Sequence, residues 1–211
     1  MEISIDIRKL GKKYENRWIF HDVNCTFSRD SRTAILGSNG SGKSTLLLSI
    51  AGYLIPNKGE LIWSLDGKQI EEDSIYKYLS FAAPYIELPG DLTVSEILEH
   101  QGIFKPFIGG MTWEDALDKI NLKAFPCRQI KNLSSGMRQR LKLGLAILAD
   151  CPVLMLDEPC SNLDANAVEW YSEMISVYAE KKIIFVCSNE QKQEFSFCND
   201  TLMIEKFKSV K

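Results

Sequence analysis

The stretch that most constrains this 211-residue chain runs from Ala34 to Ile50, with the sequence AILGSNGSGKSTLLLSI. An apolar segment leads into a glycine-rich loop, and the loop leads into a second apolar segment. Glycines allow a backbone to curl tightly enough to aim successive N–H groups at one point. The loop matches G-x-x-x-x-G-K-[ST], a pattern that cradles phosphates between a strand and a helix. A strand–loop–helix unit that binds a phosphorylated ligand is therefore expected.

The residues of this loop have distinct expected roles. The positive end of the helix dipole faces the phosphates, and the Lys43 ammonium reaches the outer phosphates. The Ser44 hydroxyl is placed to bind Mg²⁺. Ligand contacts are expected along the whole loop, from Gly37, Ser38, Asn39, Gly40, Ser41, Gly42, Lys43, Ser44 and Thr45.

A second site is expected at VLMLDEP, Val153 to Pro159, where an apolar strand ends in two carboxylates. Buried acids are costly unless they meet a metal or another partner. Asp157 suits the coordination shell of Mg²⁺ through water, and Glu158 suits a general base for attack on a γ-phosphate. The guanine-reading pattern Asn-Lys-x-Asp is absent. The pair favours triphosphate chemistry with Glu158 as the catalytic residue.

A third candidate is LSSGMRQR, Leu133 to Arg140, where serines and a glycine precede a helix. A helix N-terminus of this kind binds anions. Since the glycine-rich loop already serves one ligand, a second phosphate-binding helix end makes sense if it closes over a nucleotide held by another copy. An ordinary serine cap remains the alternative.

Hydrophobic periodicity predicts the fold class. Alternating apolar residues predict strands early in the chain, a 3.6-residue period predicts helices from Thr93 to Ala149, and strands and helices alternate afterwards. Thr112 and Asp115 form a capping-box pattern, and Asn57 to Gly59 is expected to be a turn. The prediction is a single α/β domain, residues 1–211: a RecA-like, mostly parallel core, an antiparallel β-rich flap (about 1–35 and 59–80) and a helical insert (about 90–150).

Composition excludes several function classes. The net charge of −3 gives no support to nucleic-acid binding. The six cysteines are scattered singly, which is typical of reduced thiols in a cytoplasmic protein rather than of a metal cluster. The N-terminus lacks a signal-peptide core, and the longest apolar run is about half of the roughly 20 residues that a membrane span requires.

Taken together, these motifs resemble an ABC-type ATPase domain over essentially the whole chain. Walker A lies at residues 37–45, Walker B at 153–158, and the signature, L-S-G-G-Q in the family, is L-S-S-G-M at 133–137. A D-loop, SNLD, spans Ser161 to Asp164. Tyr14 stands where the family has an aromatic residue that stacks on adenine. A tyrosine packed at a strand end is the alternative for this position.

The resemblance implies a head-to-tail dimer, either a homodimer or a heterodimer, that sandwiches two ATP molecules with Mg²⁺. Ser134 and Gly136 of one subunit would contact the γ-phosphate bound by the other. Membrane-spanning subunits on separate chains would receive the motion, so the chain is expected to be cytoplasmic and peripheral on the inner face of the cell membrane.

Two family residues are missing. The family has a glutamine about eight residues before its LTV helix start, and that count reaches Pro84 here. The family also has a switch histidine, and the corresponding strand places Ser188 there, with Asn189 next to it, so that either residue could replace the histidine. A serine hydroxyl donates one neutral hydrogen bond and carries no imidazolium charge. Slow ATP hydrolysis is therefore expected.

Three functions remain open from the sequence. The leading one is the ATPase subunit of a membrane transporter. The second is a nucleotide-gated regulatory module with little or no turnover, which the missing histidine favours and Glu158 opposes. The third, a soluble ABC-type ATPase acting on DNA or ribosomes, is disfavoured because such relatives carry two ATPase domains or a long coiled-coil insert.

Overall fold

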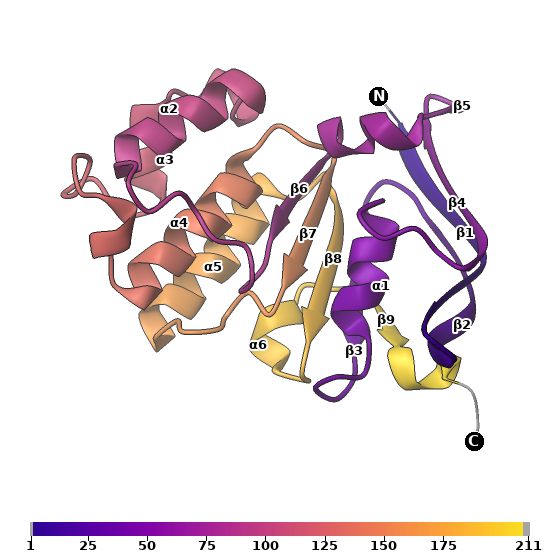
Figure 1. Ribbon diagram of the computed structural model, residues 1–211. Coiled ribbons are helices and arrows are strands. Elements are labelled where there is room, and N and C mark those ends of the chain that lie inside the picture. The colour runs from indigo at the N-terminus through magenta and orange to yellow at the C-terminus, as the bar shows by residue number, and fades with distance from the viewer. Residues whose placement is uncertain (1, 209–211) are drawn as a thin grey trace.

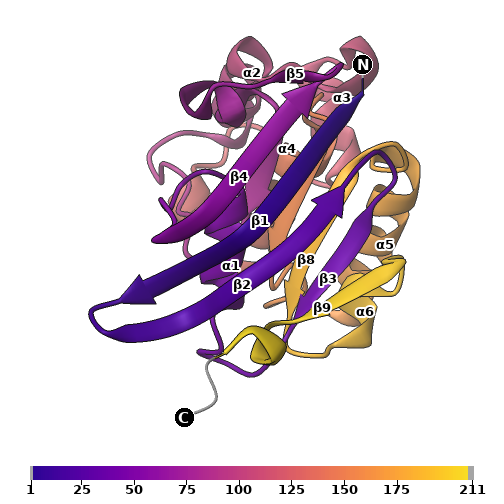
Figure 2. The same ribbon diagram turned by 90° about the vertical axis from the view of Figure 1, so that its right-hand side faces the viewer.

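The computed structural model describes residues 2–208 and contains two β-sheets with helix α1 (Lys43–Ile50) between them (Figure 1). Each sheet has a simple order of strands. The antiparallel sheet has the order β2 (Arg17–Phe27), β1 (Ile3–Tyr14), β4 (Lys58–Leu65), β5 (Lys68–Gln69), and Figure 2 views it face on. The parallel sheet has the order β6 (Leu79–Ala82), β7 (Val153–Asp157), β8 (Ile183–Ser188), β3 (Arg32–Leu36), β9 (Asp200–Met203).

The other helices lie on the side of the parallel sheet that is turned away from α1 (Figure 1). They are α2 (Val94–Phe104), α3 (Trp113–Lys119), α4 (Ser135–Leu148), α5 (Ala165–Tyr178) and the short α6 (Lys192–Phe195). The predicted capping box opens α3, where Thr112 and Asp115 bond to each other's backbone N–H groups. Within residues 2–208, no helix has the length and apolar character that crossing a bilayer requires.

The parallel sheet is buried on both faces, which explains its continuous apolar strands. In β7, Val153 and Met155 pack in the cluster that contains α1 and the antiparallel sheet. Leu154 and Leu156 pack in the cluster formed with the helical layer. Because both faces are covered, such strands contain apolar residues at every position. The predicted fold class, an α/β core with an antiparallel subdomain and a helical region, is confirmed.

Three details differ from the sequence-based expectation. β3 begins in the first segment grouped as a flap (about 1–35) and β6 begins in the second (about 59–80), but β3 pairs with β8 and β9 in the parallel sheet, and β6 pairs with β7. The pattern DTLMIEKF predicts one strand from Asp200 to Phe207, but β9 ends at Met203, and a 3₁₀ helix follows at Ile204–Phe207. The expected turn at residues 57–59 is largely strand, because β4 begins at Lys58.

Gly59 explains why the sequence suggests a turn where the chain forms a strand. Its φ is +84°, and a Cβ atom at this position would lie 2.3 Å from the Lys9 carbonyl oxygen. The glycine is therefore required by the close approach of β1 within the sheet. Opposite it, the β1–β4 register shifts between Arg8 and Gly11, and Lys9 has a φ of +48°.

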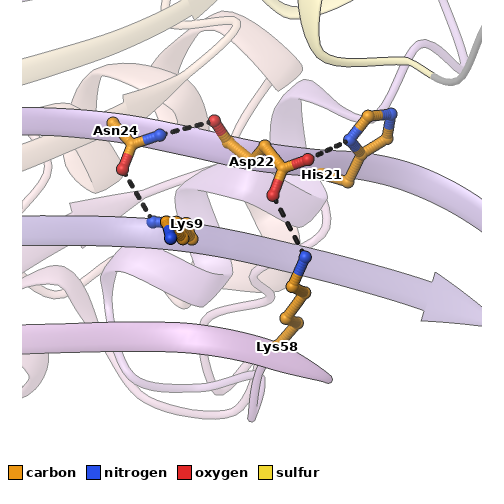
Figure 3. Close-up of polar contacts among 5 residues, drawn as sticks. All are labelled: Lys9, His21, Asp22, Asn24 and Lys58. Atoms are coloured by element: carbon orange, nitrogen blue, oxygen red, sulfur yellow. Dashed lines mark hydrogen bonds and ion pairs between the residues drawn. The ribbon is translucent and has the colours of Figure 1, made fainter.

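Side chains from the neighbouring strands stabilise this irregular part of the antiparallel sheet (Figure 3). The Lys9 N–H donates to Asn24 Oδ1 at 2.9 Å, and Asn24 Nδ2 donates to the Asp22 carbonyl oxygen at 2.8 Å. The Asp22 carboxylate lies 3.0 Å from His21 Nδ1 and 3.3 Å from Lys58 Nζ. Both of these contacts lie at the surface, so each adds little stability.

Four strands of the parallel sheet bring their carboxyl ends to one edge. Leu36 at the end of β3 pairs with Ser188 at the end of β8, and Asp157 at the end of β7 pairs with Cys187. β6 ends beside β7, at Ala82. In open α/β sheets, ligands bind at this edge. The loops that follow these strands therefore form the candidate site.

Candidate functional site

The glycine-rich loop connects β3 to α1 as predicted. Residues 37–42 form the loop, and α1 begins at Lys43. Gly42 has a φ of +110°, and a Cβ atom at this position would lie 2.4 Å from the Ile19 side chain. Only glycine therefore allows the antiparallel sheet to pack this closely against the start of α1. The helix N-terminus points toward the space in front of the loop, where its dipole favours an anion.

Lys43 lies folded back into its own loop. Its Nζ donates to the carbonyl oxygens of Gly37 at 2.8 Å and Ser38 at 3.1 Å. It also donates to Asn189 Oδ1 at 2.5 Å. The side chain is buried, and these three oxygens satisfy its three donors. A phosphate would therefore take over bonds that the loop and Asn189 make here.

Asp157 is a buried carboxylate without a hydrogen-bond partner among the residues described. Burial raises its pKa, and the nearby hydroxyls of Ser44 and Tyr85 counteract this increase only in part. An orphaned carboxylate beside a serine hydroxyl is the donor set that Mg²⁺ uses together with substrate phosphates. No group of three or more His, Cys, Asp or Glu side chains suited to a metal occurs within residues 2–208. Ser44 and Asp157 thus fit Mg²⁺ only as partial ligands.

Glu158 follows Asp157 in a left-handed conformation, with a φ of +45°. Its side chain is half-buried, and its Oε1 accepts a 3.0 Å hydrogen bond from Asn189 Nδ2. Asn189 therefore bridges Lys43 and Glu158 through the two ends of one amide. The sequence analysis noted Asn189 only as the neighbour of Ser188.

Ser188 does not face the loop. It is fully buried, and its hydroxyl is hydrogen-bonded to Glu194 Oε2. Asn189, and not Ser188, therefore lies beside Lys43 and Glu158. A one-residue difference reverses the direction of a side chain at the end of a strand, which is why counting along the sequence left the choice between Ser188 and Asn189 open.

The helix α4 that carries the signature sequence packs against the loop that follows Glu158. Ser134 caps this helix by accepting from the Met137 N–H at 3.2 Å, and it is exposed. A Cβ atom on Gly136 would lie 3.4 Å from the Asn162 carbonyl oxygen. One turn further along, Gln139 Nε2 donates to the Pro159 carbonyl oxygen at 2.9 Å. The signature residues are thus placed on an open helix end that contacts the D-loop.

A cavity of about 580 Å³ lies next to the glycine-rich loop. Its walls include Trp18 and Ile19 of β2 and Gly40 and Ser41 of the loop. Tyr14 lies outside this lining, at the end of β1, with 49% of its surface exposed. The sequence analysis assigned no function to Trp18. Its position beside the loop, which only the folded hairpin reveals, makes it a second aromatic candidate for contact with a base.

Tyr85 is another residue that sequence reasoning missed. It follows Pro84, the position reached by counting to the family's glutamine. Burial raises the pKa of Tyr85, and the Asp157 carboxylate raises it further. A hydroxyl thus lies near the carboxylate expected to hold Mg²⁺. The motif YIEL contained this tyrosine, but nothing in its spacing pointed to Asp157.

Together, the glycine-rich loop, the lysine, the serine and the two strand-end acids at one sheet edge define a P-loop nucleoside triphosphatase fold. The family model described as ABC transporter matches residues 20–161. This match covers more than half of the chain, and the chain belongs to the ABC transporter family. The resemblance stated from the motifs is confirmed.

Curated relatives share moderate identity with this chain. An uncharacterized ABC transporter ATP-binding protein of Bacillus subtilis (strain 168) is 26% identical over 202 residues, covering 94% of this chain and 91% of the relative. A cytochrome c biogenesis ATP-binding export protein of Rhizobium johnstonii is 31% identical, covering 82% and 81%. An Fe(3+) ions import ATP-binding protein of Pectobacterium atrosepticum is 27% identical over 97% of this chain, which spans 59% of that relative.

Solved structures share the fold. A dimeric bacterial ABC transporter cassette superimposes with a TM-score of 0.79 at 23% identity, covering 95% of this chain and 94% of the other. A bacterial Atm1-family ABC exporter with ATP bound gives 0.79 at 19% identity, covering 97% of this chain and 38% of the other. These similarities support the α/β architecture with its antiparallel subdomain.

Proposed function

We propose that this chain is the ATP-binding and ATP-hydrolysing subunit of a membrane ABC transporter. In this proposal two copies, or this chain and a related one, pair head to tail and hold two ATP molecules between them. Membrane-spanning subunits on separate chains receive the motion and hold the protein at the inner face of the membrane. The observation that carries the proposal is that Lys43, Ser44, Asp157 and Glu158 gather at one sheet edge, with each side chain suited to a different part of Mg·ATP.

Each of these residues has a chemical task in the proposed reaction. Lys43 leaves its loop carbonyls and Asn189 to neutralise the outer phosphates. Ser44 and Asp157 would hold Mg²⁺, which would supply charge neutralisation for the phosphates. Glu158 accepts a hydrogen bond from Asn189, and its other oxygen remains available to accept a proton from the attacking water.

The dimer is proposed because, among the residues described, the signature residues contact the D-loop and form no hydrogen bond to the glycine-rich loop of the same chain. Ser134 and Gly136 stand at the N-terminus of α4, exposed or half-exposed, on the helical layer. An open helix N-terminus with a serine cap binds the γ-phosphate of a nucleotide presented by a second subunit. Turnover is proposed to be slow, because Asn189 offers a neutral amide where an imidazolium would form charge-assisted bonds.

The Glu158→Gln variant tests this function. Wild-type protein with Mg·ATP should release phosphate, and the variant should lose nearly all of that activity, because removing a general base costs about 10²–10⁴ in rate. The variant should also form a dimer in size-exclusion chromatography with Mg·ATP and remain monomeric with Mg·ADP. A wild-type rate that Glu158→Gln leaves unchanged would refute hydrolysis at this site.

A regulatory nucleotide-binding module is the second candidate, and the neutral amide of Asn189 favours it. Asn189 bonds to both Lys43 and Glu158, but it carries no charge with which to support turnover as an imidazolium would. This candidate predicts ATP-dependent dimerisation of the wild type with no phosphate release above the Glu158→Gln background. Phosphate measurements on the two proteins side by side therefore separate the candidates.

A further inference from the structure

A third acidic side chain lies buried behind the site, and the proposed reaction does not use it directly. Glu194 is on α6 and is 2% exposed. Its Oε1 accepts from the Cys160 backbone N–H at 3.2 Å, and its Oε2 bonds to the Ser188 hydroxyl. A buried carboxylate is costly, so a core position filled by glutamate rather than by an apolar residue calls for a reason beyond packing.

The two partners of Glu194 are Cys160, in the loop after the catalytic carboxylate, and Ser188, at the end of β8. Cys160 is two residues after Glu158 and leads into the D-loop at Ser161. Ser188 ends β8 and precedes Asn189, whose amide bonds to Lys43 and Glu158. One carboxylate therefore joins the start of the D-loop to the residue that orients Asn189.

The surrounding contacts fix this carboxylate in place. The Tyr171 hydroxyl of α5 donates to the Glu194 carbonyl oxygen at 2.9 Å, and the Glu194 N–H donates to the Gln191 carbonyl oxygen at 2.9 Å. The Ser188 hydroxyl, in turn, accepts from the Gln191 N–H at 3.2 Å. With an N–H arriving at its oxygen, the serine hydroxyl is free to donate its proton to Glu194. The direction of the Ser188–Glu194 bond is thus set by the backbone.

The charges around Glu194 do not explain why an acidic residue occupies this buried position. Burial raises its pKa, and the carboxylates of Glu158 and Asp157 add to the increase. No lysine or arginine forms an ion pair with it among the residues described. The carboxylate is therefore retained against unfavourable electrostatics, and its two hydrogen bonds are what it contributes.

We propose that Glu194 is a positioning residue for ATP hydrolysis, which ties the D-loop at Cys160 to Ser188 so that the Asn189 amide stays directed at Glu158. This inference rests on the proposed function. When a second subunit displaces the D-loop, the bond to Cys160 transmits the displacement through Ser188 to Asn189. Glu194 itself contacts neither the phosphates nor the water.

Hydrogen exchange of the nucleotide-free protein tests the connection without activity. In Glu194→Leu, the Cys160 amide loses its acceptor and should exchange about tenfold faster, as expected for the loss of a charge-assisted hydrogen bond. Gln193→Leu, a change to the exposed neighbour on the same helix, should leave that exchange unchanged. Unchanged exchange at Cys160 in Glu194→Leu would overturn the proposal.

A double-mutant cycle with Asn189→Ala tests the direction of the coupling. Glu194→Leu alone should lower kcat about tenfold or more with KM for ATP nearly unchanged, because a misplaced side chain slows chemistry more than binding. In the Asn189→Ala background the same change should have little further effect on kcat. Equal losses in both backgrounds would show a merely structural role and overturn the proposal.

Ser188→Ala keeps the test decisive if Glu194→Leu does not fold. It removes only the hydroxyl and should reproduce the loss of kcat, again without effect in the Asn189→Ala background. An additive effect would count against the proposal. Failure of the proposed function would look different, because Glu158→Gln would then hydrolyse ATP like the wild type while the exchange result at Cys160 stood.

Discussion

The amide of Asn189 donates a 3.0 Å hydrogen bond to Glu158 Oε1 and accepts a 2.5 Å hydrogen bond from Lys43 Nζ. The proposed general base and the proposed phosphate-binding lysine are therefore connected through one neutral side chain. Binding of a triphosphate at Lys43 would break one end of this bridge and leave the other end on Glu158. The state of the nucleotide and the orientation of the base are coupled by this geometry.

Replacing Asn189 with aspartate should weaken ATP binding. The carboxylate would form a charge-assisted bond to Lys43 that the phosphates must displace, and it would add a negative charge beside Glu158 and the triphosphate. We expect the Kd for a non-hydrolysable ATP analogue to rise about tenfold, measured by isothermal titration calorimetry with Mg²⁺.

Asn189→Ala is the matched control for this prediction. It removes the same hydrogen bonds without adding charge, so the Kd should stay within about threefold of the wild type while kcat falls. Equal weakening by alanine and aspartate would show that the lost amide, rather than the added charge, determines affinity.

Asp157→Asn should stabilise the nucleotide-free protein while impairing its function. Among the residues described, neither carboxylate oxygen has a hydrogen-bond partner, and a buried charge without a partner costs more than a buried neutral amide. A neutral amide should raise the free energy of unfolding by about 1 kcal/mol, or Tm by about 2–4 °C for a domain of this size. Thermal unfolding should also show that Mg²⁺ no longer adds to the stabilisation by ATP.

Asp150→Asn provides the comparison for this test. It makes the same chemical change at an exposed position just before β7, and it should leave both Tm and the Mg²⁺ effect unchanged. A lower Tm in Asp157→Asn would mean that the carboxylate has partners that stabilise it in the nucleotide-free protein.

Ser134→Ala should reduce both stability and nucleotide-dependent dimerisation. Loss of the cap on Met137 should cost about 1 kcal/mol. Thr112→Ala removes a comparable cap from α3 and should cost a similar amount. In the Glu158→Gln background, size-exclusion chromatography with Mg·ATP should show loss of the dimer for Ser134→Ala only. Loss of the dimer in both variants would attribute the effect to stability alone.

Lys182 should make stability depend on pH in the alkaline range. It is 6% exposed, donates to the carbonyl oxygens of Ile147 and Ala149 near the end of α4, and burial lowers its pKa to about 8. An unfolded lysine has a pKa of about 10.4, so between these values the unfolded chain binds more protons. The contribution of Lys182 to stability therefore rises as pH increases from about 8 to about 10.4.

Urea unfolding of the wild type and Lys182→Met at several pH values measures this contribution. The difference in free energy of unfolding should shift in favour of the wild type by up to about 3 kcal/mol across the window. Lys181→Met, at the exposed neighbouring position, should show no such shift relative to the wild type. A difference independent of pH in Lys182→Met would contradict the lowered pKa.

Much of the fold could be predicted because the sequence patterns are local. Continuous apolar runs such as residues 153–157 identified buried parallel strands, and Thr112 with Asp115 identified a helix start. The assignment of β3 to the flap failed because sheet membership depends on pairing partners far along the chain. Gly59 suggested a turn because a glycine that allows a close approach has the same sequence signal as a turn glycine.

The site was predictable where a motif fixes the backbone and unpredictable where one strand's end must be aligned with another. Lys43, Ser44, Asp157 and Glu158 follow directly from their motifs, and the structure brings them to one edge. Choosing between Ser188 and Asn189 required the side-chain direction at the end of β8. Tyr85 and Glu194 act across more than thirty residues of sequence, so no spacing rule identifies them.

Helix α1 lies between two sheets and packs against both. The hairpin bearing Tyr14 and Trp18 is thereby joined to the loop bearing Lys43 through a single hydrophobic cluster. Because the hairpin and the loop are held at a fixed distance, a ligand that contacts both must have a matching distance between its base and its phosphates. Length selection among phosphorylated ligands can thus occur within one subunit, before any second copy arrives.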